Sequence, residues 1–315
     1  MAAPEESDSD LVDLKSPLPA TGHDPVLLTE VLASLDVAPG KVMVDGTTGR
    51  GGHALAVAQK LGPTGQLLCL DADPRNLEYA RQRLAQAACP ARFFHANFAE
   101  LDDVLKAAQI PRVDGVLADL GISTNQLFES AYGMSFSLDM PLDMWVDPRL
   151  EKSAADLINH LREEDLANVL YELAQERYSR RIARKIGEAR RLSPIITTGR
   201  LADLVRSAIP RRGGAPEKID PATRTFLALR MAVNQELENL AALLKLAPQL
   251  LTPGGRFAVI SFQSMEDRLV KQAFRSLDAT GVCDVLTPKP LSPSPEELSH
   301  NPRSRSAKLR AVVKR

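Results

Sequence analysis

The chain has 315 residues, of which 44% are hydrophobic and 25% charged, and its formal net charge is −1. That length suits one large domain or two ordinary ones, and the composition is typical of a soluble globular protein. The near-neutral charge excludes nucleic-acid binding through overall charge, so any such affinity requires a local basic patch. The three cysteines lie far apart without metal-binding spacing. We therefore expect no disulfide framework and no metal site, and a reducing cytoplasm fits.

The first residues of the chain are acidic and lack both a basic stretch and an apolar core. They do not have the pattern of a signal or transit peptide, and we expect residues 1–22 to form a disordered tail. No apolar run approaches the length of a membrane span, so we expect no membrane partner.

From residue 41 onwards, apolar strands alternate with amphipathic helices, a pattern that indicates a mostly parallel sheet covered on both faces. The predicted strands are Lys41–Thr47, Gln66–Asp71, Arg92–His95 and Val113–Leu120. The predicted helices between them are Gly52–Leu61, Pro74–Ala88 and Glu100–Ala108.

After residue 122 this alternation stops. Residues 123–150 have a loop-like pattern, and Ala154–Arg212 is helical with no strand candidate. Strand-like sequence returns at Gly255–Phe262, followed by a helix at Glu266–Leu277 and a last strand at Ala307–Val313. We predict an α/β domain, 23–128 and 226–315, interrupted by a helical insertion, 129–225. The Pro/Ser-rich segment 288–302 is expected to be an ordered loop or a flap.

A glycine-rich segment, Asp45 to His53, follows the first predicted strand and opens the first predicted helix. Strand, glycine turn and helix start let backbone N–H groups approach a small polar ligand. A second acid, Asp71, ends the next strand, where a carboxylate can accept hydrogen bonds from ribose hydroxyls. The alternative is an ordinary strand-to-helix turn. With Asp71 in register, the sequence favours a site for an adenosine-containing cofactor.

The spacing of the glycines decides between cofactors. Glycines at 46, 49, 51 and 52 do not fit the G-x-G-x-x-G of dinucleotide sites, and Asp45 would repel a pyrophosphate. The same carboxylate can accept a hydrogen bond from the ammonium group of S-adenosylmethionine, which also carries a ribose. We therefore predict S-adenosylmethionine, with His53 positioning groups rather than acting as a general base.

Polar or aromatic residues stand at or just past the ends of all the main predicted strands, namely Asp45, Asp71, Phe98, Asp119 and Phe262. Ligands of such sheets bind at the carboxyl ends of the strands. We predict that Asp119 is catalytic, because a carboxylate there can hold an exocyclic amino group and accept its proton. The alternative is that Asp119 caps a turn.

Two basic segments are candidates for an RNA interface. The first segment is Glu176–Arg191, a predicted helix with Arg177, Arg181 and Arg184 on one face. The second segment is Asn301–Arg310, which contains Arg303 and Arg305. The alternative for the first segment is a solvated helix surface. The single tryptophan, Trp145, is expected in the core, although stacking on a target base is the alternative.

These segments, taken in order, resemble the bacterial ribosomal RNA small subunit methyltransferase H family, which methylates the N4 atom of a cytidine. The matching segments are His23–Leu28, Asp45–His53, Asp71–Pro74, Asp119–Ser123, Gln126–Leu127, Pro141–Met144, Pro221–Phe226, Ala228–Arg230, Val233–Leu237, Ile260–Phe262, Glu266–Arg268 and Asn301–Arg310.

The resemblance implies a class I methyltransferase fold (Rossmann-like) and S-adenosylmethionine as the methyl donor. It also implies a target cytidine in the decoding region of small-subunit (16S) rRNA. The partner that it implies is this rRNA or the ribosomal subunit that contains it. The cofactor contacts that it implies are Gly51, Gly52, His53, Asp71, Phe98, Asp119 and Gln126.

Four positions differ from the residues that the family usually has, namely Tyr132, Trp145, Leu227 and Gln263. They motivate two alternatives. One is methylation of another rRNA position or another amino-bearing base. The other is a weakly active, RNA-binding ribosome assembly factor.

Overall fold

The computed structural model describes residues 25–210 and 220–315, apart from the side chains of Thr124 and Phe128. The predicted tail, 1–22, lies outside the described residues. Within them the chain divides into two compact units. The first, here called the sheet unit, contains residues 25–121 and 237–315, and the second, the helical unit, contains residues 122–236.

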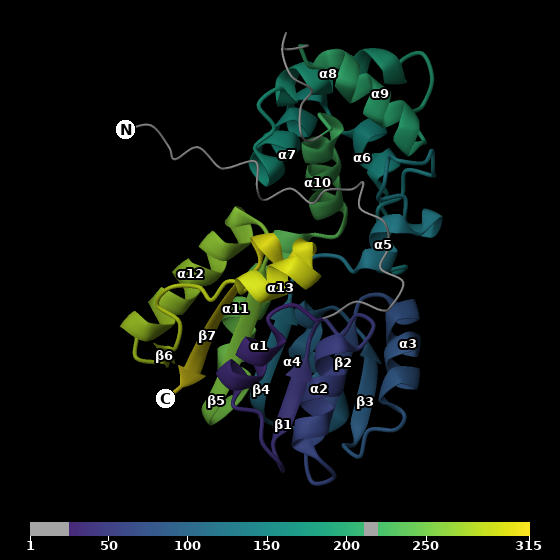
Figure 1. Cartoon of the computed structure of the whole chain (residues 1–315). Helices are drawn as coiled ribbons and strands as arrows, with labels where there is room; N and C mark the ends of the chain where they lie inside the picture. The colour runs from purple at the N-terminus through teal and green to yellow at the C-terminus, as the bar shows by residue number, and fades with distance from the viewer. Residues whose placement is uncertain (1–24, 211–219) are drawn as a thin grey trace. The chain divides into compact units, whose positions relative to one another are not determined.

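The sheet unit contains a seven-stranded sheet with the strand order β3-β2-β1-β4-β5-β7-β6 (Figure 1). Its strands are β1 (Val42–Asp45), β2 (Gln66–Asp71), β3 (Ala91–His95), β4 (Val113–Asp119), β5 (Leu251–Ser261), β6 (Cys283–Val285) and β7 (Lys308–Lys314). Strands β1 to β5 pair in parallel, whereas β7 pairs antiparallel with both β5 and β6. This mostly parallel sheet confirms the predicted class I methyltransferase fold.

Two apolar clusters cover the two faces of the sheet. One contains buried residues of α4 (Leu101–Ala108), α11 (Glu236–Leu250) and α12 (Ser264–Ala279). The other contains residues of α1 (Leu28–Leu35), α2 (Gly52–Leu61) and α3 (Pro74–Leu84). Because the central strands are buried on both sides, they are continuously apolar, as parallel strands usually are.

Local sequence explains where several helices begin. Asp73 caps α3 by accepting a hydrogen bond from Arg75 N, and Pro74 takes the first helical position. Ser294 and Pro295 start α13 (Pro295–His300) in the same way, inside the segment for which we predicted a loop or a flap. The short 3-10 turns η2 (Phe98–Glu100) and η4 (Pro302–Ser306) follow β3 and α13.

The helical unit has its own core. Its elements are α5 (Thr124–Phe128), η3 (Ser130–Tyr132), α6 (Ala154–His160), α7 (Glu163–Ala174), α8 (Ser179–Arg190), α9 (Thr198–Ala208) and α10 (Ala222–Val233). Apolar residues at helical spacing, such as Leu166 and Leu170 on α7 and Ile182 and Ile186 on α8, form one buried cluster. The insertion therefore stands between β4 and β5 in the chain, as the sequence indicates.

Candidate active site

Three acidic residues end three neighbouring parallel strands. Asp45 is the last residue of β1, Asp71 the last of β2 and Asp119 the last of β4. The order in which successive strands are added to the sheet reverses between β1 and β4, and open α/β sheets bind ligands at such a point. Phe98 and Phe262 follow β3 and β5 directly or within three residues. The structure thus places all five predicted residues at the carboxyl end of the sheet.

The glycine turn is held by the acids on either side of it. Asp45 Oδ1 accepts a hydrogen bond from Thr47 N at 3.2 Å, and Asp71 Oδ2 accepts one from Gly49 N at 2.6 Å. Asp71 Oδ1 also accepts from Asp73 N at 2.8 Å. Asp71 therefore orients the turn through both of its carboxylate oxygens.

Gly51 has a structural reason to be glycine. Its φ of +79° is left-handed, and a Cβ there would lie 3.0 Å from Leu84 and 3.3 Å from Ala80 on α3. At Gly46, a Cβ would lie 3.2 Å from the Cβ of Phe98. These close approaches bring the backbone of the turn against α3 and against the residue that follows β3.

Two buried carboxylate oxygens have no hydrogen-bond partner among the described residues, Asp45 Oδ2 and Asp119 Oδ1. Burial, with nearby Asp71, raises the pKa of Asp45 to about 7. Burial, followed by the charges of Asp45 and Glu266, raises the pKa of Asp119 well above its ordinary value. Buried acceptors without donors are costly in a folded protein, so these atoms indicate a ligand that brings its own donors.

Asp71 shares this environment. Burial raises its pKa to about 6, against the lowering effect of the N–H groups of Asp73 and Gly49. Three carboxyl groups with raised pKa values therefore lie at the carboxyl ends of three neighbouring strands. Such a cluster is unusual and indicates a functional site.

His53 lies at the start of α2 and is buried. Its Nε2 is 2.8 Å from the carbonyl oxygen of Val26, and its Nδ1 is 3.5 Å from Asp119 Oδ2. The predicted catalytic acid and the histidine of the glycine turn therefore contact each other.

Two residues of this site were not predicted from the sequence. The hydroxyl of Thr47 accepts a hydrogen bond from Asp119 N at 2.6 Å and so joins β1 to β4. Glu266 is buried, and its carboxylate accepts hydrogen bonds from the N–H groups of Phe262 and Gln263, both at 3.0 Å. An acid three residues after a helix cap is a recognisable capping-box signature, and this pattern could have identified Glu266.

The residues present fit S-adenosylmethionine. Asp45 offers an unpaired carboxylate oxygen for an ammonium group, Asp71 offers acceptors for ribose hydroxyls, and the glycine turn lets the ligand approach the backbone. Among the described residues no group of three or more His, Cys, Asp and Glu side chains is placed to hold a metal ion.

The helical unit contains four predicted site residues, Gln126, Arg177, Arg181 and Arg184, and they stand in different settings. Gln126 is buried on α5, where its side chain accepts a hydrogen bond from Ser123 N at 3.0 Å. Arg181 and Arg184 are exposed on α8, and Arg184 forms a 3.8 Å ion pair with Glu163.

The prediction that Arg177 lies on the same helix is wrong. Helix α7 ends at Ala174, and α8 begins only at Ser179. Glu176 is buried between them, and its carboxylate accepts a hydrogen bond from Tyr178 N at 2.8 Å, which forms a turn. Arg177 is exposed on this turn.

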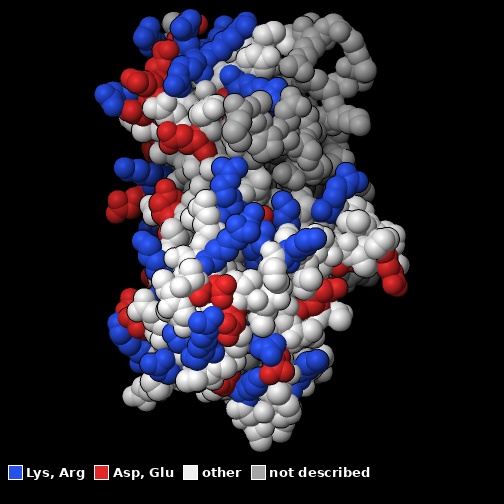
Figure 2. All heavy atoms as spheres, turned by 90° about the vertical axis from the view of Figure 1, so that its left-hand side faces the viewer, with Lys and Arg blue, Asp and Glu red and all other residues white. Residues whose placement is uncertain are grey.

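Basic side chains are numerous on the helical unit. Figure 2 shows Lys and Arg at the upper end of the view, with Asp and Glu among them, and further Lys and Arg over the middle and lower parts of the same face. The second basic segment, in the sheet unit, forms η4, where Arg305 is exposed and burial lowers the pKa of the half-buried Arg303.

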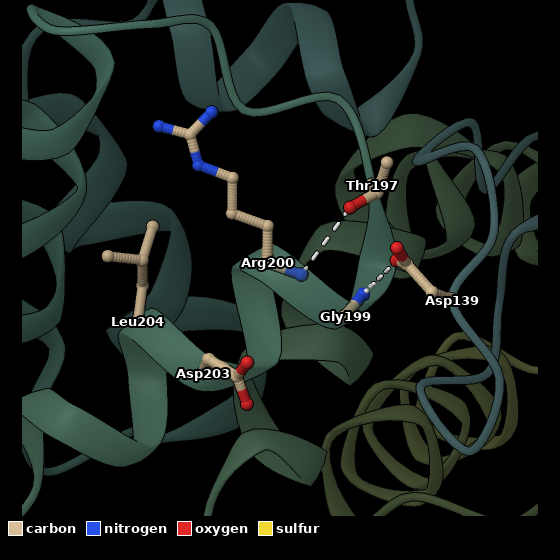
Figure 3. Close-up of a pocket in the computed structure, with 6 residues that line it drawn as sticks. All are labelled: Asp139, Thr197, Gly199, Arg200, Asp203 and Leu204. Atoms are coloured by element: carbon tan, nitrogen blue, oxygen red, sulfur yellow. Dashed lines mark hydrogen bonds between the residues drawn. The ribbon is translucent and has the colours of Figure 1, made fainter.

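The helical unit also contains an open pocket of about 550 Å³, lined by Asp139, Thr197, Gly199, Arg200, Asp203 and Leu204 (Figure 3). Arg200 extends away from Asp139, and its guanidinium donates to Ser193 Oγ at 2.6 Å and to the carbonyl oxygen of Pro194 at 2.7 Å. Asp139 accepts from Gly199 N at 2.8 Å. Asp139 and Arg200 therefore form hydrogen bonds with the chain around the pocket itself, from Ser193 to Gly199.

The four positions that differ from the family have structural roles. Tyr132 is completely buried, and Trp145 and Leu227 are partly buried against the core of the helical unit. Gln263 caps α12 through the capping box with Glu266. Trp145 therefore packs against the core of the helical unit, but it is partly buried and not fully buried.

Comparison with known proteins gives one consistent result. The family model described as the MraW methylase family matches residues 20–315. "Ribosomal RNA small subunit methyltransferase H" of Acidobacterium capsulatum is 45% identical over 300 residues, covering 93% of this chain and 98% of that protein. The protein of the same name from Solibacter usitatus is 45% identical, and the match covers 93% of this chain and 100% of that protein. The one from Desulfosudis oleivorans is 42% identical, and the match covers 93% of this chain and 98% of that protein. With a methyltransferase fold, three acids at its switch point and a family match over nearly the whole length, the chain belongs to the MraW methylase family.

Proposed function

We propose that this protein transfers a methyl group from S-adenosylmethionine to the N4 amino group of a cytidine in the decoding region of 16S rRNA. The observation that carries the proposal is the pair of unpaired carboxylate oxygens on Asp45 and Asp119, at the ends of β1 and β4. The family match and the names of the relatives support the choice of substrate.

Each residue has a stated task in this proposal. Asp45 accepts a hydrogen bond from the ammonium group of the cofactor, and Asp71 accepts from the ribose hydroxyls. Gly51, Gly52, His53, Phe98 and Gln126 complete the cofactor contacts that the family resemblance implies. When bound, the cofactor supplies a methyl group on a positively charged sulfur.

Asp119 acts on the substrate. The exocyclic amine of cytosine is a weak nucleophile because its lone pair is delocalised into the ring. A carboxyl group that orients the amine and takes up its proton contributes about 10²–10⁴-fold. Holding amine and methyl group in line contributes more, at best about 7–11 kcal/mol. The target base must be unpaired or flipped out of a helix to reach this site.

For the rest of the chain we propose that the helical insertion, 129–225, binds RNA through Arg177, Arg181 and Arg184. We propose that Arg303 and Arg305, which belong to the methyltransferase domain, also bind RNA. The methyltransferase domain comprises 23–128 and 226–315. We place the protein in the cytoplasm with the small ribosomal subunit. None of the helices within residues 25–210 and 220–315 is long and apolar enough to cross a membrane.

The test is transfer of a radiolabelled methyl group to small subunits from a strain that lacks this protein, followed by nucleoside analysis. N4-methylcytidine is expected from the wild-type protein, and Asp119→Asn should lower the rate about 10²–10⁴-fold. A different modified nucleoside would identify another substrate. No incorporation, despite measurable cofactor binding, would identify an assembly factor.

A further inference from the structure

The contact between His53 and Val26 fixes which nitrogen of the imidazole carries a proton. Nε2 of His53 is 2.8 Å from the carbonyl oxygen of Val26, and a carbonyl oxygen can only accept a hydrogen bond. Nε2 must therefore be protonated. In a neutral imidazole the other nitrogen, Nδ1, then has a lone pair and is a base.

That lone pair faces a carboxyl oxygen. Nδ1 of His53 is 3.5 Å from Oδ2 of Asp119, and the His53 side chain is only 7% exposed. An unprotonated Nδ1 and an ionised carboxylate would repel each other at this distance. The pair is stable when it shares one proton, held either by Oδ2 or by Nδ1.

The surroundings place that proton on Asp119. Among the described residues, the negative charges of Asp45 on β1 and Glu266 on α12 act on Asp119, and His53 on α2 contacts it. Both acids and burial raise the pKa of Asp119 well above its ordinary value. With the shared proton on Asp119, that residue is a neutral carboxyl group whose Oδ2 lies 3.5 Å from Nδ1 of His53.

A neutral carboxyl group cannot accept a proton unless it releases its own. We propose that Asp119 and His53 form a proton relay, in which His53 is the final acceptor of the proton lost by the target amine. This proposal rests on the proposed function. It adds that His53 completes the proton transfer of the proposed reaction. The sequence indicated only a positioning role for His53.

In this transfer, each proton that one group loses is gained by the next group. The methyl group would come from the sulfur of the cofactor, and the carbon–sulfur bond would break with its electron pair left on sulfur. The amine nitrogen, bonded to the methyl carbon, then has four bonds and a positive charge. One N–H bond breaks, its electron pair stays on nitrogen, and the proton passes to Oδ1 of Asp119. At the same time the Oδ2–H bond breaks, and that proton passes to Nδ1 of His53. Asp119 stays neutral, the amine becomes neutral, and His53 becomes an imidazolium ion.

Oδ1 of Asp119 suits the first of these transfers because it has no hydrogen-bond partner among the described residues. Thr47 holds the backbone of Asp119 through a 2.6 Å hydrogen bond, and Glu266 fixes the turn after β5. The backbone around the relay is thus held at three strand ends.

The test compares two substitutions of His53. His53→Gln places an amide N–H where Nε2 lies, so it can keep the hydrogen bond to Val26 but has no basic nitrogen. His53→Ala loses both. We expect single-turnover rates of His53→Gln at saturating cofactor to fall about 10²-fold or more, with a far smaller change in cofactor KM. The acid limb of the pH–rate profile, where His53 is already protonated, should also disappear.

Free imidazole provides a further control. It should restore part of the rate of His53→Ala, whose side chain leaves space, and none of the rate of His53→Gln. A His53→Gln enzyme with the wild-type rate and the wild-type acid limb would overturn the relay.

The tautomer can be measured without any reaction. In cofactor-free protein labelled with ¹⁵N-histidine, long-range ¹H–¹⁵N spectra should show His53 with a proton on Nε2 and a basic Nδ1. Asp119→Asn should change the titration of that Nδ1. A proton on Nδ1 alone would disprove the relay, whereas a wild-type enzyme that makes no N4-methylcytidine would disprove the proposed function and leave this result standing.

Discussion

Asp45 is a carboxyl group that titrates near physiological pH, since its pKa is about 7. Its ionised form is the one that can pair with a cofactor ammonium group, and that pairing lowers the pKa in the complex. Cofactor affinity should therefore fall as pH drops below 7, by up to tenfold per pH unit. Calorimetric titration between pH 5.5 and 8.5 measures this slope.

The matched control is Asp45→Asn, which keeps an oxygen for the 3.2 Å hydrogen bond from Thr47 N but cannot ionise. Its affinity should be weaker at pH 8, and its pH dependence should lose the component due to Asp45. The same slope in both proteins would mean that another group, such as Asp71, controls binding.

Asp71 has a structural role besides the ligand role proposed for it, because it accepts hydrogen bonds from the backbone of both Gly49 and Asp73. Asp71→Ala removes both acceptors, so we expect at least a tenfold loss of cofactor affinity, about 1.4 kcal/mol. Asp71→Asn keeps one acceptor and should lose less. Calorimetry with a thermal unfolding control measures both, and an unchanged affinity in Asp71→Ala would remove Asp71 from the site.

At the level of elements, helix α8 presents a basic surface whose members differ in their partners. Arg181 is exposed, whereas Arg184 forms an ion pair with Glu163. If Arg181 contacts an RNA phosphate, Arg181→Ala should weaken binding and reduce the slope of log affinity against log salt by about one. Filter binding at several salt concentrations measures the slope.

Lys60 provides the control for this measurement, because it is an exposed cation at the far end of α2. Lys60→Ala should leave the slope unchanged. Equal slopes for wild-type protein and Arg181→Ala would mean that this face of α8 is only solvated.

The sequence predicts the parallel part of the sheet well because strongly apolar strands and glycine turns are local signals. It places Asp45, Asp71 and Asp119 at strand ends, where the structure has them. It misses β6, which has only three residues. It also extends the basic helix back over Arg177, because the burial of Glu176 in the turn is not visible in the local pattern. The Val26–His53–Asp119 chain joins residues that are far apart in sequence, so no local pattern reveals it.

At the scale of the whole molecule, the two units have separate cores that share no buried residue among those described. The single tryptophan, Trp145, packs against the core of the helical unit and so reports on that unit. Ile186→Ala, in the same core, should lower the unfolding free energy by about 2–5 kcal/mol when followed by Trp145 fluorescence. Cofactor affinity should be unchanged.

Leu68→Ala makes the matching change in the sheet unit, where Leu68 is also fully buried. It should weaken cofactor binding and leave the fluorescence midpoint in place. Equal shifts of that midpoint by both substitutions would show that the two units unfold together.

The helical unit between β4 and β5 also delays the synthesis of β5 relative to that of β4. About 130 residues separate the end of β4 from the start of β5. A ribosome that adds roughly 5–20 residues per second needs about 7–26 s to bridge them. During that interval the growing chain carries β1 to β4 with one edge of β4 still lacking its neighbour, and such an edge can pair with other chains. The speed of translation through the helical unit therefore determines how long each nascent molecule is exposed to misassembly.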